Sequence, residues 1–202
     1  MLDLAALTAD SQQEATIRAL LQHRATALGI RPVAFEVLRH PRQDPGVWKE
    51  ADAFLKAFRS RAEHALVVLD HQWEGSPPDP EGMRKELLDR LERVDWTRDV
   101  CEVVVVVPEL EVWVWGSSPA VSKVLRYDVG TIRRIADEHS WWPANKAKPV
   151  APKELLEAVL RRQRRPRSAS IFEELAQRVS LERCTDPAFA LLREALQRWF
   201  RA

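Results

Sequence analysis

The sequence predicts one α/β domain with a four-stranded, mainly parallel sheet, flanked by helices and followed by a helical C-terminal extension. Two observations support this fold class. Short apolar runs alternate with segments whose apolar residues recur at helical spacing, which is typical of βαβ units. Two of the runs, residues 65–69 and 103–107, are uninterrupted, as expected for strands buried on both faces. A chain of 202 residues is long enough to bury one sizeable core.

The first half of the chain supplies the sheet and its helices. Strands are expected at residues 4–9, 33–38, 65–69 and 103–107. Helices are expected at residues 11–28, 47–58 and 80–91, with a loop at residues 40–46. Ser11 and Glu14 form a capping-box pattern for the first helix, and Asp79 followed by Pro80 is a start signal for the third. Such alternation favours right-handed parallel crossovers.

The second half is predicted to be helical. Start signals lie at Ser118-Pro119 and Asp128, and the Trp141-Trp142-Pro143 segment ends that helical region. Further helices are expected at residues 152–165, from Ser170, and from the cap at Asp186-Pro187. The sequence thus divides into an α/β core at residues 1–116 and a helical extension at residues 117–202 that packs on it.

The composition excludes several general modes of action. With 31 basic and 30 acidic residues, the net charge of +1 gives no overall attraction to nucleic acid or anionic membranes. No apolar stretch is long enough to span a membrane, and the N-terminal residues lack a signal-peptide pattern. The two cysteines are expected to be reduced, so a cytoplasmic location is predicted.

Acidic residues follow the predicted strands. Ligands of open parallel sheets bind beyond the carboxyl ends of the strands, and a strand order of 2-1-3-4 makes strands one and three neighbours. Asp10 and Asp70 then face one crevice as metal ligands, with Glu74 and either Glu109 or Glu111 close by. Such a carboxylate cluster suits Mg²⁺. The alternative is structural, because Asp10 and Glu14 can simply stabilise the start of a helix.

These residues also resemble a known family. The segment from Asp10 to Glu14 resembles the acidic strand-to-helix motif of Toprim-like domains, and Asp70 lies where those domains carry an Asp-x-Asp pair. Residues 108–113, Pro-Glu-Leu-Glu-Val-Trp, resemble the signature of a bacterial Toprim-like group found in mobile defence islands. The chain resembles a small component of methylation-associated antiphage defence systems.

The resemblance implies a Mg²⁺ site that acts on nucleic-acid phosphodiesters. It also implies a weakened site, because Asp10 stands where the pattern has glutamate and Gln72 stands where it has its second aspartate. The resemblance therefore implies that catalysis is lost unless Glu74 substitutes for the missing carboxylate.

Other polar residues are candidates for binding nucleic acid or a partner protein. They are His40, Arg42, Asp44, His71, Arg161, Arg162, Arg164, Arg165 and Arg167. Arginine binds phosphate in a bidentate manner, but the arginine run also ends a predicted helix, where positive charge offsets the helix dipole. The histidines and their neighbours could equally form surface hydrogen bonds and rigid turns.

Two functions are consistent with these observations. The first is a partner-binding or sensing subunit of an antiphage defence system, which works with other defence proteins through a degenerate Toprim-like site. The second is a Mg²⁺-dependent nuclease or phosphoryl-transfer enzyme acting on nucleic acid, with Asp10, Asp70 and one of Glu14, Glu74 and Glu111 as its catalytic carboxylates.

Overall fold

The computed structural model describes every residue from Met1 to Ala202. Its centre is a sheet of four parallel strands in the order β2-β1-β3-β4. The strands are β1 (Leu2–Thr8), β2 (Phe35–Arg39), β3 (Ala62–Asp70) and β4 (Cys101–Val106). The predicted α/β fold with a four-stranded parallel sheet is therefore confirmed, and β1 lies beside β3 as the order 2-1-3-4 requires.

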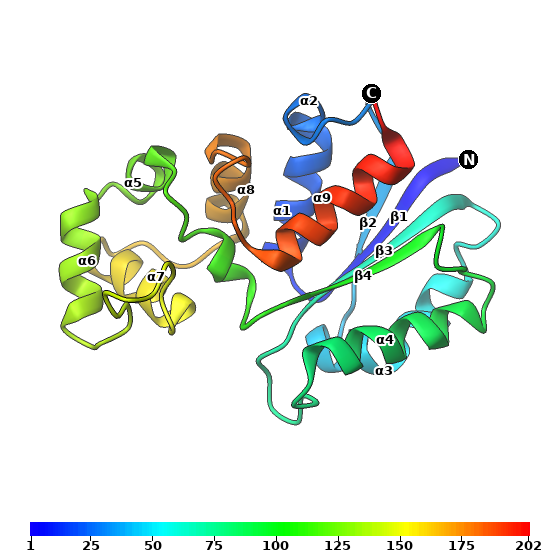
Figure 1. Ribbon diagram of the computed structural model, residues 1–202, viewed down its shortest axis with the longest axis horizontal. Helices are drawn as coiled ribbons and strands as arrows, with labels where there is room; N and C mark the ends of the chain where they lie inside the picture. The colour runs from blue at the N-terminus through cyan, green and yellow to red at the C-terminus, as the bar shows by residue number, and fades with distance from the viewer.

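Helices cover both faces of this sheet (Figure 1). One face carries α1 (Ser11–His23), α2 (Ala25–Leu28) and α9 (Pro187–Phe200), and the other carries α3 (Gln43–Lys56) and α4 (Pro80–Glu92). Successive side chains of a strand point to opposite faces. Accordingly, Leu66 packs in the core below α1 and α9, whereas its neighbour Val67 packs in the core against α3 and α4.

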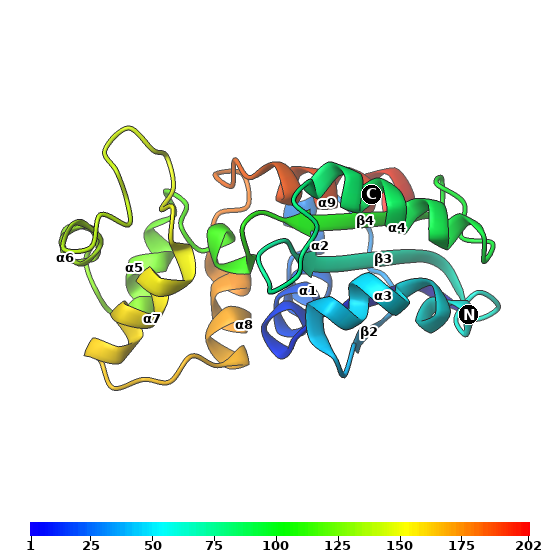
Figure 2. The same ribbon diagram turned by 90° about the horizontal axis from the view of Figure 1, so that it is seen from below.

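The remaining helices form a separate layer beyond the carboxyl ends of the strands (Figure 2). They are the 3₁₀ helix η1 (Leu110–Trp113), α5 (Pro119–Leu125), α6 (Val129–Asp137), α7 (Pro152–Arg162) and α8 (Ala169–Arg178). Their own core includes Trp115, Leu155 and Phe172. The last helix, α9, returns to the sheet, so residues from both sides of position 116 contribute to both layers.

Local signals located most helix starts correctly. Asp79 and Asp186 cap α4 and α9 through their side chains, as predicted. The predicted capping box of Ser11 and Glu14 is wrong by one residue, because Asp10 is the N-cap and accepts hydrogen bonds from the amides of Gln12 and Gln13. An N-cap carboxylate satisfies amides that have no partner within the helix.

Helix α3 begins four residues earlier than predicted. The segment expected to be a loop contains Pro45 and Gly46, but α3 already starts at Gln43. Proline is tolerated in the first turn of a helix because no intrahelical partner exists for its amide. Asp44 therefore lies in the first turn of α3 rather than in a loop.

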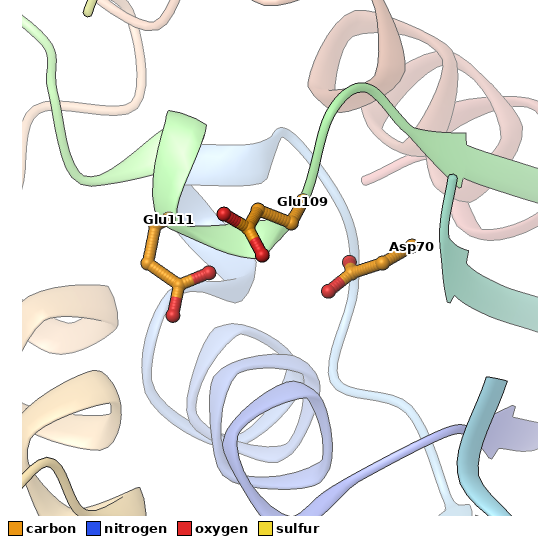
Figure 3. Close-up of side chains that lie close together, drawn as sticks. All are labelled: Asp70, Glu109 and Glu111. Carbon is orange, nitrogen blue, oxygen red and sulfur yellow. The ribbon is translucent and has the colours of Figure 1, made fainter. Parts of the chain in front are cut away.

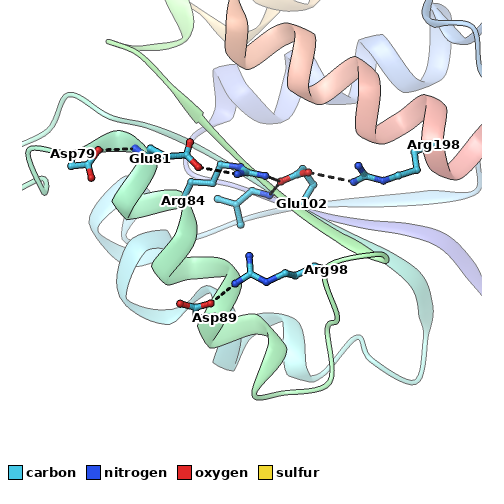
Figure 4. Close-up of polar contacts among 8 residues, drawn as sticks. Asp79, Glu81, Arg84, Asp89, Arg98, Glu102 and Arg198 are labelled. Carbon is cyan, nitrogen blue, oxygen red and sulfur yellow. Dashed lines mark hydrogen bonds and ion pairs between the residues drawn. The ribbon is translucent and has the colours of Figure 1, made fainter.

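Charged side chains lie at β4, an edge strand of the sheet whose own residues are all buried. Glu102, only 4% exposed, forms ion pairs with Arg84 of α4 at 2.6 Å and with Arg198 of α9 at 3.3 Å (Figure 4). One of its oxygens also accepts a hydrogen bond from the amide of Val103. An edge strand presents unpaired amides that invite association with another chain. Glu102 thus occupies part of this edge and links the helices of both faces.

Candidate cation site

Three buried carboxylates meet where β3 and β4 end (Figure 3). Asp70 is the last residue of β3, and Glu109 and Glu111 lie in the segment that follows β4. One oxygen from each carboxylate lies within 4.8 Å of the others. Since Asp70 pairs with Val106 in adjacent parallel strands, the ends of these strands lie at the same edge of the sheet. The topology therefore brings the three acidic side chains together.

The orientation of Asp70 is fixed by hydrogen bonds. Its Oδ1 accepts hydrogen bonds from Gln13 Nε2 at 2.9 Å and from the amide of Leu110 at 3.0 Å. Its own amide donates to Asp44 Oδ1 at 2.7 Å. Gln13 is oriented in turn, because its Oε1 accepts a hydrogen bond from the amide of Ala9 at 2.9 Å. Contacts from α1 and η1 thus hold the Asp70 carboxylate in place, and a contact from α3 holds its backbone.

Two cationic side chains from the helical layer approach the two glutamates. Lys153 Nζ lies 3.4 Å from Glu109 Oε2, and Arg167 Nη2 lies 2.5 Å from Glu111 Oε1. Glu111 is completely buried, yet neither of its oxygens accepts a hydrogen bond of good geometry. Buried polar atoms normally have such partners. The site therefore holds three carboxylates but only two cationic side chains, and the carboxylate of Glu111 could still accept hydrogen bonds or bind an ion.

Burial makes it costly to ionise these groups. Burial, followed by repulsion from Asp44, raises the pKa of Asp70 well above its ordinary value. Burial and then the charge of Glu111 raise the pKa of Glu109 to about 7, although Lys153 opposes the shift. The pKa of Glu111 also rises through burial, against the favourable charge of Arg167. Loss of water around a charged group disfavours its ionised form.

The donor set fits a hard divalent cation. Mg²⁺ prefers oxygen ligands and is commonly held by one or two carboxylates together with water. Asp70, Glu109 and Glu111 could hold such an ion, and Glu111 Oε2, which accepts no hydrogen bond, is available to it. Added positive charge would also offset the cost of keeping three carboxylates out of water.

The predicted acidic residues separate into two groups. Asp10 and Asp44 lie close enough to Asp70 for their charges to raise its pKa, although Asp10 itself caps α1. Glu14 instead forms an ion pair with Arg18, and Glu74 is exposed in the loop after β3. The sequence offered Glu109 and Glu111 as alternatives, and the structure brings both to Asp70.

The histidines form local contacts outside the acidic cluster. His40 is buried, with Nε2 3.2 Å from Glu50 Oε2 and Nδ1 accepting a hydrogen bond from the amide of Arg42. His71 Nε2 lies 2.8 Å from the carbonyl oxygen of Pro77. His71 thus forms a local hydrogen bond of the kind considered as its alternative, whereas the expected turn after His40 is replaced by the start of α3.

The arginine run has several destinations. Arg162 forms an ion pair with Glu138, Arg165 donates to the carbonyl of Val124, and Arg167 reaches Glu111. Arg161 and Arg164 are exposed and form no ion pair. Sequence patterns gave no sign of the contact between Arg167 and Glu111, or of the role of Lys153, because both depend on how the helical layer packs.

Comparisons with protein-family models, with curated proteins and with solved structures gave no match to this chain. None of its helices combines the length and apolar character needed to cross a membrane. What stands is an α/β domain with a four-stranded parallel sheet and a buried acidic triad that could hold a metal ion.

Proposed function

We propose that this chain binds Mg²⁺ at Asp70, Glu109 and Glu111 and acts in phosphoryl transfer on nucleic acid. The observation that carries the proposal is the convergence of three buried carboxylate oxygens within 4.8 Å at the carboxyl edge of a parallel sheet. This edge is where ligands bind in open α/β sheets. The resemblance of residues 10–14 and 108–113 to Toprim-like motifs supports the choice of reaction and substrate.

The bound cation would neutralise charge on a phosphate group and activate water. The surrounding residues have separate tasks. Gln13 and the amide of Leu110 orient Asp70, so that one ligand is held in position before the ion arrives. Lys153, beside Glu109, adds a positive charge next to the site that can attract a phosphate oxygen.

Titration calorimetry with Mg²⁺ and with Mn²⁺ tests the cation site directly. The parent protein should bind at pH 8, and Asp70→Asn should bind at least tenfold more weakly because a ligand charge is lost. Glu74→Gln is the matched control, since it removes one exposed carboxylate from the neighbouring loop. Absence of binding in the folded parent, or equal binding by the parent and Asp70→Asn, would contradict the proposal.

A second candidate is a partner-binding or sensing subunit of an antiphage defence system. It is favoured by one feature of the site: Lys153 and Arg167 already pair with Glu109 and Glu111, as expected where a cation has been replaced by side chains. This candidate predicts a stable complex with other components of the same defence system and no cation binding. Co-purification of the tagged chain with those components, with and without EDTA, distinguishes the two functions.

A further inference from the structure

A basic hollow adjoins the acidic triad. It is a shallow, open depression of about 470 Å³ where α7 ends. Seven residues line it: the four arginines Arg161, Arg164, Arg165 and Arg167, one carboxylate, Glu157, and the uncharged Leu160 and Pro166. The charged side chains of this lining do not suit a purely hydrophobic ligand. The lining instead favours an anionic ligand with several oxygen atoms.

Side-chain and backbone hydrogen bonds fix the shape of this hollow. Gln163 and Arg165 donate to the carbonyl oxygens of Leu125 and Val124, which ties the segment after α7 to the end of α5. The amide of Arg165 donates to the carbonyl of Leu160 at 3.0 Å and closes the end of α7. The lining arginines therefore project from an ordered turn.

Two of the arginines are free to bind a ligand. Arg162 is paired with Glu138, but Arg161 and Arg164 are exposed without an ion pair. Arg167 belongs to both regions, because it lines the hollow and contacts Glu111 of the triad. The basic hollow and the candidate cation site are therefore neighbours that share the Arg167 side chain.

We propose that the hollow binds the phosphate groups of a nucleic-acid strand and leads that strand to the cation site. This inference rests on the proposed function and assigns its substrate-binding surface. Guanidinium groups bind phosphate oxygens in pairs of hydrogen bonds, and a line of them can follow a phosphodiester backbone. Because the whole chain carries a net charge of only +1, such affinity must come from a local cluster.

Fluorescence anisotropy with a labelled single-stranded DNA 20-mer, in EDTA, tests the inference. The double variant Arg161→Gln/Arg164→Gln should bind at least tenfold more weakly than the parent. Its slope of log affinity against log salt should also fall by about 1.4, the value for two lost phosphate contacts on a single strand. The control Lys56→Gln/Arg93→Gln removes the same charge from exposed residues at the ends of α3 and α4 and should bind like the parent.

Competition identifies the ligand. Unlabelled oligonucleotide should displace the probe, whereas inorganic phosphate or poly-glutamate at equal charge concentration should not. Equal loss of binding in both double variants would overturn the inference, as would preferential displacement by poly-glutamate, which would indicate an acidic protein partner. Because EDTA removes the cation, this result is independent of the calorimetry. If the parent binds the cation but Arg161→Gln/Arg164→Gln binds DNA as tightly as the parent, the proposal for the hollow is wrong and the cation site stands.

Discussion

Arg167 is expected to compete with a cation for Glu111. Its Nη2 lies 2.5 Å from Glu111 Oε1, so the guanidinium occupies an oxygen that a metal ion would use. Arg167→Gln keeps a hydrogen-bond donor at this position and removes the charge. We expect this variant to bind Mg²⁺ more tightly than the parent, whereas loss of a purely supporting residue would weaken binding.

The size of the effect follows from Coulomb's law. Two unit charges about 4 Å apart interact by about 4 kcal/mol at an effective dielectric constant of about 20. Part of this is offset because Glu111, without its partner, holds its proton more firmly. At least about 1.4 kcal/mol, a tenfold gain in affinity, should remain at high pH. The gain should shrink at pH 6.5, where protons compete with the cation.

Calorimetry at pH 6.5 and pH 8.5 measures both affinities, and circular dichroism confirms that the variant is folded. Arg162→Gln serves as the control, since its partner Glu138 is remote from the triad and exposed. A folded Arg167→Gln protein that binds Mg²⁺ no better than the parent at pH 8.5 would refute the competition. Equal gains in Arg167→Gln and Arg162→Gln would refute it as well, because they would indicate a general effect of net charge.

Three further changes probe the fold and the site. The pKa of Glu109 rises from 4.5 to about 7, so protonated Glu109 contributes to folding stability below pH 4.5. This contribution, up to about 3 kcal/mol, is lost as the pH rises through 7. Between pH 5 and pH 8, the free energy of urea unfolding should therefore fall less for Glu109→Gln than for the parent. Glu102→Ala should lower the free energy of unfolding by about 1–3 kcal/mol, because two arginines lose a buried partner, whereas the exposed Glu81→Ala should change it by less than about 0.5 kcal/mol. Gln13→Leu removes a donor from Asp70 and should weaken Mg²⁺ binding in calorimetry; unchanged affinity would show that Asp70 needs no such support.

The parts of the fold predicted correctly are those governed by local pattern. Uninterrupted apolar runs identified β3 and β4, because only strands covered on both faces carry such sequences. The Asp79-Pro80 and Asp186-Pro187 pairs marked helix starts, because a capping carboxylate and a proline both suit the first turn. Each of these signals acts within a few residues of the chain.

The start of α3 was missed because tertiary packing decides it. Gly46 appeared to be a turn residue, but it lies in the helix, where a Cβ atom would come within 2.1 Å of His40 Nδ1. The glycine is therefore required by the close approach of a buried histidine. A sequence pattern cannot separate this use of glycine from its use in a turn.

The two residues that depart from the Toprim-like pattern, Asp10 and Gln72, lie outside the acidic triad. Gln72 is exposed, and Asp10 accepts hydrogen bonds from amides of its own helix, so the three carboxylates that converge come from other positions. Glu109 and Glu111, with Asp70, form the triad without help from Glu74. A neutral residue at position 72 therefore leaves the candidate cation site intact. The stronger argument against a bound cation is Arg167, whose guanidinium group already forms an ion pair with Glu111.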